Sequence, residues 1–340
     1  MKAPAPRLSR ALARLGVSVW VLFAAVACAT PERAFPTPEQ ARADPVSALV
    51  RIRAHILPDA RTAPSLGLMR EGTGVMIDPT GLVLTIGYLV LEASGIELMD
   101  ATGRTVPARL IGYDFGTGFA ILRPALPLTA KPIELGDSST LGESELVMIA
   151  TRDAVSLAYV TSRRTFAGYW EYLLENAIFT APPRADFGGA ALIGRDGRLL
   201  GIGSLFVGDA AAPQTRSPGN MFVPINALKP ILPDLIANGR PRVPAQPWLG
   251  LNLLEFDGQV LVTRVSPESP AERVGVRVGD MIVAVGSDSV SDLADLYRKV
   301  WARGAAGTEV PLKLLRESRL WEVVVPTIDR LQYLRSNPTY

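Results

Sequence analysis

The sequence predicts an all-β-dominated protein built from two parts, and three of its features support this. Over residues 46–240, short apolar segments with strand periodicity alternate with turn signals rich in glycine, proline and aspartate. A proline-rich linker at 241–247 interrupts this pattern. Residues 248–329 then combine short strands with one helical pattern, which indicates a smaller α+β domain. A chain of 340 residues that is 48% hydrophobic can bury two such cores.

Residues 1–28 predict an export signal. Basic residues without acidic ones precede an apolar run at 15–27, which is too short to span a bilayer. The Ala-Val-Ala-Cys sequence that ends at Cys28 resembles a lipobox, so we expect lipidation of Cys28 and a lipid-anchored periplasmic protein. Ordinary cleavage after small residues is the alternative. Residues 29–45, rich in proline and charge, are the expected linker to the first domain.

Composition argues against several classes of function. The net charge is +2 and the basic residues are spread along the chain, which argues against a nucleic-acid partner. Cys28 is the single cysteine, so no intramolecular disulfide can form. Cys28 and the single histidine, His55, leave only carboxylates as strong metal ligands, so we expect no metal site and no other cofactor.

The first part of the chain should begin with a strand at 46–56 and continue with a hairpin whose turn is Asp-Pro-Thr-Gly at 78–81. Further strands are expected at 143–150 and 155–162, and a helix at 228–237. These segments resemble the chymotrypsin-like serine proteases of the HtrA/Deg family. The resemblance implies a double six-stranded β-barrel over residues 46–240.

The stretch 180–202 resembles the nucleophile loop of that family, which reads Gly-Asn-Ser-Gly-Gly-Pro-Leu. Gly188 and Gly189 keep the frame of the oxyanion loop, but Phe187 stands at the place of the serine. By the same resemblance, Tyr88 stands at the place of the catalytic histidine and Gly118 at the place of the aspartate that orients it.

These substitutions predict an inactive protease. A phenyl ring cannot attack a carbonyl, a tyrosine with a pKa of about 10 is a poor base, and glycine orients nothing. We expect Phe187 and Tyr88 to fill the former cleft instead. His55 lies far along the sequence from every motif position and is not expected to replace the base. The segment from Phe179 to Phe187 is about two residues shorter than in the family, which implies an altered substrate wall.

Residues 248–329 resemble a PDZ domain of the bacterial protease type, most closely at 269–280. The resemblance implies that a peptide C-terminus adds as a strand, with its carboxylate held by backbone N–H groups. Ser291 is the expected N-cap of the groove helix. The expected peptide-binding residues are Trp248, Leu249, Gly250, Leu251, Leu293 and Tyr297. A core role for Leu293 and Tyr297, and a PDZ fold without ligand binding, are the alternatives.

Together these features predict a catalytically inactive HtrA-like envelope protein with a tail at 330–340. Its expected partners are peptides or C-termini of envelope proteins, with an active protease as another candidate, and its expected role is that of an adaptor, sensor or regulator in protein quality control. The resemblance also makes a homotrimer plausible. The alternatives are an active HtrA-type serine endopeptidase with a non-standard site and a purely structural envelope lipoprotein.

Overall fold

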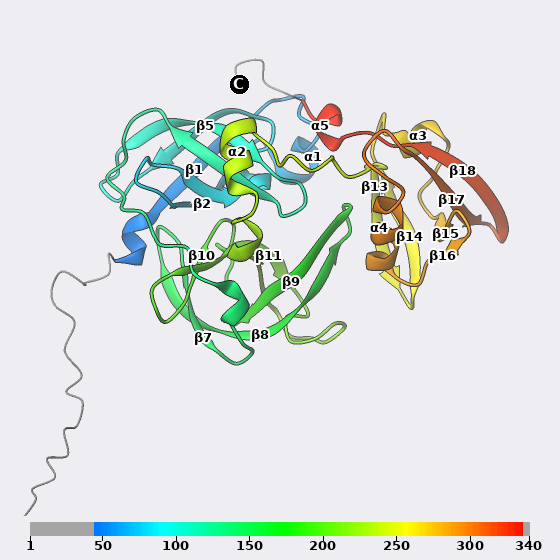
Figure 1. The fold of residues 1–340 in the computed structure, drawn as a ribbon. Coiled ribbons are helices and arrows are strands. Elements are labelled where there is room, and N and C mark those ends of the chain that lie inside the picture. Colours follow the sequence, from blue (N-terminus) through cyan, green and yellow to red (C-terminus); the bar gives the residue numbers. More distant parts are fainter. Residues whose placement is uncertain (1–43, 336–340) are drawn as a thin grey trace, which may run out of the picture. The chain divides into compact units, whose positions relative to one another are not determined.

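The computed structural model describes residues 44–335. The predicted signal, Cys28 and nearly all of the predicted linker 29–45 therefore lie outside the described residues. Figure 1 shows the strands of the first barrel in blue and cyan, those of the second in green, and the C-terminal domain in yellow to red. Among residues 44–335, no helix is both long and apolar enough to cross a membrane.

The first barrel is a closed antiparallel sheet with the strand order β1-β2-β3-β6-β5-β4. Its strands are β1 (Leu49–Ile56), β2 (Met69–Met76), β3 (Val83–Ile86), β4 (Ala93–Met99), β5 (Thr105–Tyr113) and β6 (Phe119–Pro124). The turn predicted at 78–81 joins β2 to β3, and the Asp78 carboxylate accepts the Leu82 N–H at 2.8 Å. The predicted first strand starts three residues late, at Leu49, because Asp44 caps a 3₁₀ turn, η2 (Pro45–Ala48).

The second barrel closes in the order β10-β11-β12-β9-β8-β7. It contains β7 (Leu146–Ala150), β8 (Val155–Gly168), β9 (Tyr172–Ala181), β10 (Ala191–Ile193), β11 (Leu199–Val207) and β12 (Gly219–Pro224). Strand β8 is longer than the predicted 155–162 because it continues into a hairpin with β9. The helix predicted at 228–237 begins only at Leu232, as α2 (Leu232–Asn238), with proline in its first turn.

The C-terminal domain has the sheet order β13-β14-β15-β17-β18, with β16 paired to β15. Its elements are β13 (Leu251–Phe256), β14 (Gln259–Val265), α3 (Pro270–Arg273), β15 (Met281–Val285), β16 (Asp288–Ser289), α4 (Leu293–Trp301), β17 (Glu309–Arg316) and β18 (Arg319–Pro326). Part of the expected tail forms a further helix, α5 (Arg330–Tyr333). Two closed barrels and a separate antiparallel sheet confirm the predicted fold class.

The prediction of Ser291 as the N-cap of α4 is wrong by one residue. The cap is Asp292, whose carboxylate accepts the N–H of Asp295 at 2.7 Å. The Ser291 hydroxyl instead donates to the Asp292 carboxylate at 3.0 Å. The apolar face of α4 is buried in the core of the domain through Leu293, Leu296, Tyr297 and Val300.

Asp280 is a buried charge in this C-terminal core, with 1% of its side chain exposed. Arg316 donates to its two carboxylate oxygens at 2.6 and 2.7 Å, and the Arg277 N–H donates at 2.8 Å. Burial alone would raise the pKa of Asp280, but these hydrogen bonds hold it below its ordinary value. The charged form is therefore favoured in the folded domain.

We expect Asp280→Asn to lower the free energy of unfolding by about 3 kcal/mol, because Arg316 loses its charged partner while largely buried. Since the folded pKa is depressed, the stability that Asp280 contributes should be present above a pH of about 4 and lost as the pH falls further. Urea unfolding at several pH values measures both effects. The control is Glu71→Gln, which breaks a half-exposed pair with Arg53 and should cost about 0.5 kcal/mol. Equal losses in the two variants would contradict the prediction.

Candidate functional site

The loop that resembles a nucleophile loop is fixed against the first barrel. The Thr73 N–H donates to the Gly188 carbonyl at 2.9 Å, and the Thr85 hydroxyl donates to the Thr73 carbonyl at 2.8 Å. Gly189 has a φ of +74° and donates its N–H to the Gly203 carbonyl at 2.9 Å. The Gly189 amide is thus engaged in the second barrel.

Tyr88 lies beside this loop, in the 3₁₀ turn η3 (Gly87–Leu89). A Cβ atom added to Gly188 would meet the Tyr88 hydroxyl oxygen at 2.9 Å. Burial raises the pKa of the Tyr88 phenol above its ordinary value, so the phenol stays protonated at neutral pH. The buried Arg70 donates to the carbonyls of Tyr88 and Leu91 at 2.6 and 3.2 Å and holds the turn in place.

Gly118 lies next to the same turn, since its carbonyl accepts the Gly87 N–H at 2.7 Å. It has a φ of +81°, which favours glycine. Tyr172, from the second barrel, donates its hydroxyl to the Thr117 carbonyl at 2.8 Å. A Cβ atom on Gly118 would lie 4.0 Å from that hydroxyl and 3.2 Å from Ile86. A phenol and an apolar side chain therefore surround the place where an orienting carboxylate would be needed.

The segment before Phe187 is held by polar contacts. The buried Asn220 side chain accepts the Arg184 N–H at 2.7 Å and donates to the Arg184 carbonyl at 3.0 Å. The Asp186 carboxylate accepts the Thr151 hydroxyl at 3.1 Å and also pairs with Arg184. Phe187 is half-buried. Within 180–202 the only hydroxyl belongs to Thr180, which is fully buried in β9.

The structure thus brings the positions of Tyr88, Gly118 and the loop of Gly188 into one region, yet they provide neither a nucleophile nor a base. His55 is exposed on β1, paired in register with Met69 and Gly95. Among residues 44–335, no three histidine, cysteine, aspartate or glutamate side chains gather as a metal site would require.

The C-terminal domain presents a different site, built from backbone. The N–H groups of Leu249, Gly250 and Leu251 all donate to the carboxylate of Glu171, at 2.8, 2.7 and 2.8 Å. Gly250 has a φ of +93°, and a Cβ atom there would lie 2.2 Å from the Ser269 Cβ. We call these three N–H groups the carboxylate cradle. Converging backbone N–H groups are the feature with which PDZ domains hold a peptide carboxylate.

Glu171 reaches the cradle from the turn of the β8–β9 hairpin. Its own N–H donates to the Tyr297 hydroxyl at 3.1 Å, and that hydroxyl donates to the Gly168 carbonyl at 2.7 Å. Burial raises the pKa of Glu171, while the cradle and the positive charge of Arg330 oppose this rise. Sequence reasoning missed Glu171. The only available signal is an acidic residue among the aromatic residues of a turn.

The predicted peptide-binding residues do not all converge. Leu249, Gly250, Leu251 and Tyr297 surround Glu171, as described above. The Trp248 N–H donates instead to the Ile328 carbonyl at 3.1 Å, and its ring lies 4.5 Å from that of Tyr333. Leu293 is buried at the start of α4, where its N–H donates to Glu255 at 2.9 Å.

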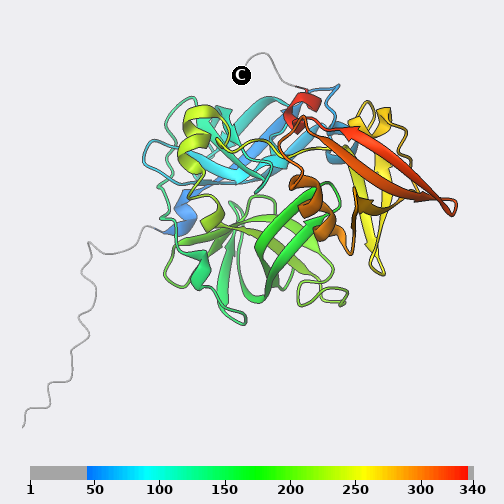
Figure 2. The same cartoon turned by 45° about the vertical axis from the view of Figure 1, so that its right-hand side comes forward.

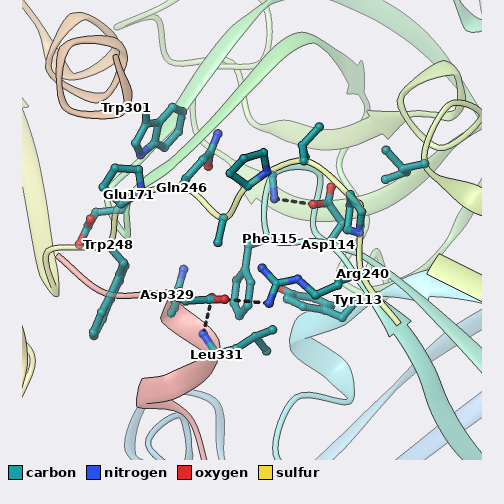
Figure 3. A pocket seen from close by; sticks show the side chains of 18 residues that line it. Tyr113, Asp114, Phe115, Glu171, Arg240, Gln246, Trp248, Trp301, Asp329 and Leu331 are labelled. Atoms are coloured by element: carbon teal, nitrogen blue, oxygen red, sulfur yellow. Dashed lines mark hydrogen bonds and ion pairs between the residues drawn. The ribbon is translucent and has the colours of Figure 1, made fainter. Parts of the chain in front are cut away.

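Glu171 is also one of the residues that line a cavity of about 380 Å³. Figure 3 shows Glu171, Trp248 and Trp301 on one side of it and Tyr113 and Arg240 on the other. An ion pair between Arg240 and Asp329, at 2.9 Å, lies in the cavity wall.

Comparisons with known proteins agree with this architecture. Residues 72–202 match the family described as trypsin-like peptidase domain, and residues 247–327 match the PDZ domain family. A putative serine protease HhoA from Synechocystis is 29% identical over 287 residues, which cover 76% of this chain and 70% of the relative. The periplasmic pH-dependent serine endoprotease DegQ from Escherichia coli is 28% identical over 297 residues, which cover 80% of this chain and 62% of DegQ.

A solved structure of the HtrA-type protease AlgW with a decapeptide has the same fold. It is 20% identical, has a TM-score of 0.50, and the match covers 87% of this chain and 98% of that one.

Proposed function

We propose that this protein, which has the trypsin-like domain and single PDZ domain of the HtrA/Deg family of serine proteases, binds the C-termini of peptides without cleaving them. One observation carries the proposal: three consecutive backbone N–H groups, of Leu249, Gly250 and Leu251, converge on one carboxylate. A free peptide carboxylate presents the same pair of oxygen atoms to such a cradle.

The geometry of the barrels supports the absence of cleavage. Phe187 offers no nucleophilic atom, the Tyr88 phenol stays protonated, and Gly118 carries no carboxylate. The Tyr172 hydroxyl lies beside the place where an orienting group would be needed and donates to the Thr117 carbonyl. A water molecule or a distant hydroxyl would find no base here to remove its proton.

The cellular role that fits this combination is that of an adaptor, sensor or regulator in envelope protein quality control. The export signal and Cys28 favour a lipid-anchored protein in the periplasm. Relatives such as DegQ are periplasmic proteases by name, which supports the same compartment. C-termini of envelope proteins are the proposed ligands. We also propose an active protease as a partner protein and a homotrimer as the oligomeric state.

Binding of short peptides tests the proposal. We expect the chain without residues 1–28 to bind fluorescein-labelled decapeptides that end in Val, Leu or Phe, titrated to about 1 mM and followed by fluorescence anisotropy. The same peptides with an amidated C-terminus should bind at least about tenfold more weakly, because the cradle loses its charged acceptor. Equal binding of free and amidated peptides would overturn the proposed function.

A further inference from the structure

The tip of the β8–β9 hairpin is packed into the PDZ domain. In Figure 2 this hairpin, in green, lies beside α4, in orange. Ala167 and Leu173, one on each strand of the hairpin, pack against the core of the PDZ domain. The Tyr297 hydroxyl fixes the turn by bonding to the backbone of both Gly168 and Glu171. The tip is therefore an ordered part of the PDZ surface.

The hairpin tip makes both kinds of contact that a peptide makes with the binding site of a PDZ domain. The Glu171 carboxylate fills the cradle, with its oxygen atoms 2.7 to 2.8 Å from the three donors. One residue of backbone pairing accompanies it, because the Leu253 N–H of β13 donates to the Tyr169 carbonyl at 2.8 Å. A peptide uses its terminal carboxylate for the first contact and its extended backbone for the second. The hairpin supplies both from within the chain.

Burial explains why the cradle and Glu171 depend on each other. Glu171 is only 9% exposed, and an ionised carboxylate is costly to bury without partners. Its partners are the three cradle donors, with Arg330 nearby, whose guanidinium donates to the Trp170 carbonyl at 3.4 Å. The cradle in turn gains carboxyl oxygen acceptors for three N–H groups that would otherwise need water or a ligand.

We propose that Glu171 is an internal ligand of the PDZ domain, which occupies the carboxylate cradle and must leave before a peptide C-terminus can bind. This inference rests on the proposed function and adds a means of regulating that same site. One cradle cannot hold two carboxylates, so the apparent Kd for a peptide equals its intrinsic Kd divided by the fraction of molecules in which Glu171 has left the cradle. Weakening the hold of Glu171 should therefore strengthen peptide binding.

Substitution of Glu171 tests the proposal in the chain without residues 1–28. With the same labelled decapeptides, Glu171→Ala should lower the apparent Kd at least about tenfold, the change expected if the internal ligand fills about 90% of the sites. Glu171→Gln should give an intermediate value, since its amide retains one uncharged acceptor oxygen. An unchanged Kd in Glu171→Ala would overturn the proposal.

The matched control removes a carboxylate from the same hairpin but not from the cradle. Glu175 pairs with Arg298 of α4 at 2.7 Å, and both side chains are more than half exposed. Glu175→Gln should change the Kd by no more than about threefold, because exposed ion pairs contribute little. A gain as large as that of Glu171→Ala would mean that general docking of the hairpin, and not occupation of the cradle, controls access. That result would overturn the role given to Glu171.

Amide hydrogen exchange separates a failure of this inference from a failure of the proposed function. The N–H groups of Leu249, Gly250 and Leu251 should exchange slowly in the unliganded protein and at least about tenfold faster in Glu171→Ala. Unchanged protection would overturn the occupation of the cradle by Glu171, whatever the peptides do. If no peptide binds to any variant, the proposed function and the competition are both overturned, and the exchange rates still report whether Glu171 fills the cradle.

Discussion

Replacing Phe187 by serine is expected to produce no measurable cleavage of unfolded casein. A serine hydroxyl at this position would still lack a base, because burial keeps the neighbouring Tyr88 phenol protonated. It would also lack an orienting carboxylate, since the third position is Gly118. Losing the members of a catalytic triad together lowers kcat by about a millionfold. We expect the kcat of both the unsubstituted protein and the Phe187→Ser variant to stay at this low value.

An active HtrA-type protease, assayed with the same casein, shows that the assay detects cleavage. A serine-directed fluorophosphonate probe provides a second measurement, because it labels an activated hydroxyl even when the substrate is poorly chosen. Casein cleavage that follows the protein peak through purification, or probe labelling of the original chain, would contradict the prediction. Either result would favour an HtrA-type endopeptidase with a non-standard site.

Substitution of Gly189 by alanine is expected to lower the free energy of unfolding by about 4 kcal/mol or more. The new Cβ would lie 1.9 Å from the Thr73 carbonyl oxygen and 2.7 Å from the Thr85 hydroxyl. Its φ of +74° adds backbone strain for any residue with a side chain. A side-chain rotation cannot relieve the contact with Thr73, because the Thr73 carbonyl oxygen belongs to the backbone. It cannot relieve the strain either, because φ is a backbone angle. Urea unfolding followed by circular dichroism measures the loss.

Gly208→Ala is the matched control, because a Cβ there meets no atom within 4 Å. It should change the free energy of unfolding by less than about 1 kcal/mol. If the two alanine variants were equally stable, the close packing of the 188–189 loop against the first barrel would be contradicted.

The fold was predictable because its signals are local. Alternation of buried and exposed residues, as in β1, and the turn at 78–81 each depend on a few neighbouring residues. The errors lie at the ends of elements, where one side chain decides. Asp292 caps α4 although the adjacent Ser291 is also a good capping residue, and η2 precedes β1 because Asp44 caps it.

The candidate site was predictable only in part, because its central contact joins distant residues. The cradle at 249–251 follows from the resemblance to PDZ domains. Its occupant, Glu171, comes from another domain and lies 78 residues before Leu249 in the sequence. No periodicity or motif connects the two segments. The predicted end of β8 at residue 162 also left the hairpin too short to reach the PDZ domain.

The hairpin that carries Glu171 belongs to the same chain as the cradle, so their encounter does not depend on the concentration of the protein. A group tethered in this way acts at an effective concentration of the order of millimolar. A free C-terminus displaces Glu171 only when its concentration, divided by its own Kd, reaches the effective concentration of Glu171 divided by the Kd of Glu171 for the cradle. A C-terminus below that level would leave Glu171 in the cradle, so the hairpin sets a threshold for peptide binding.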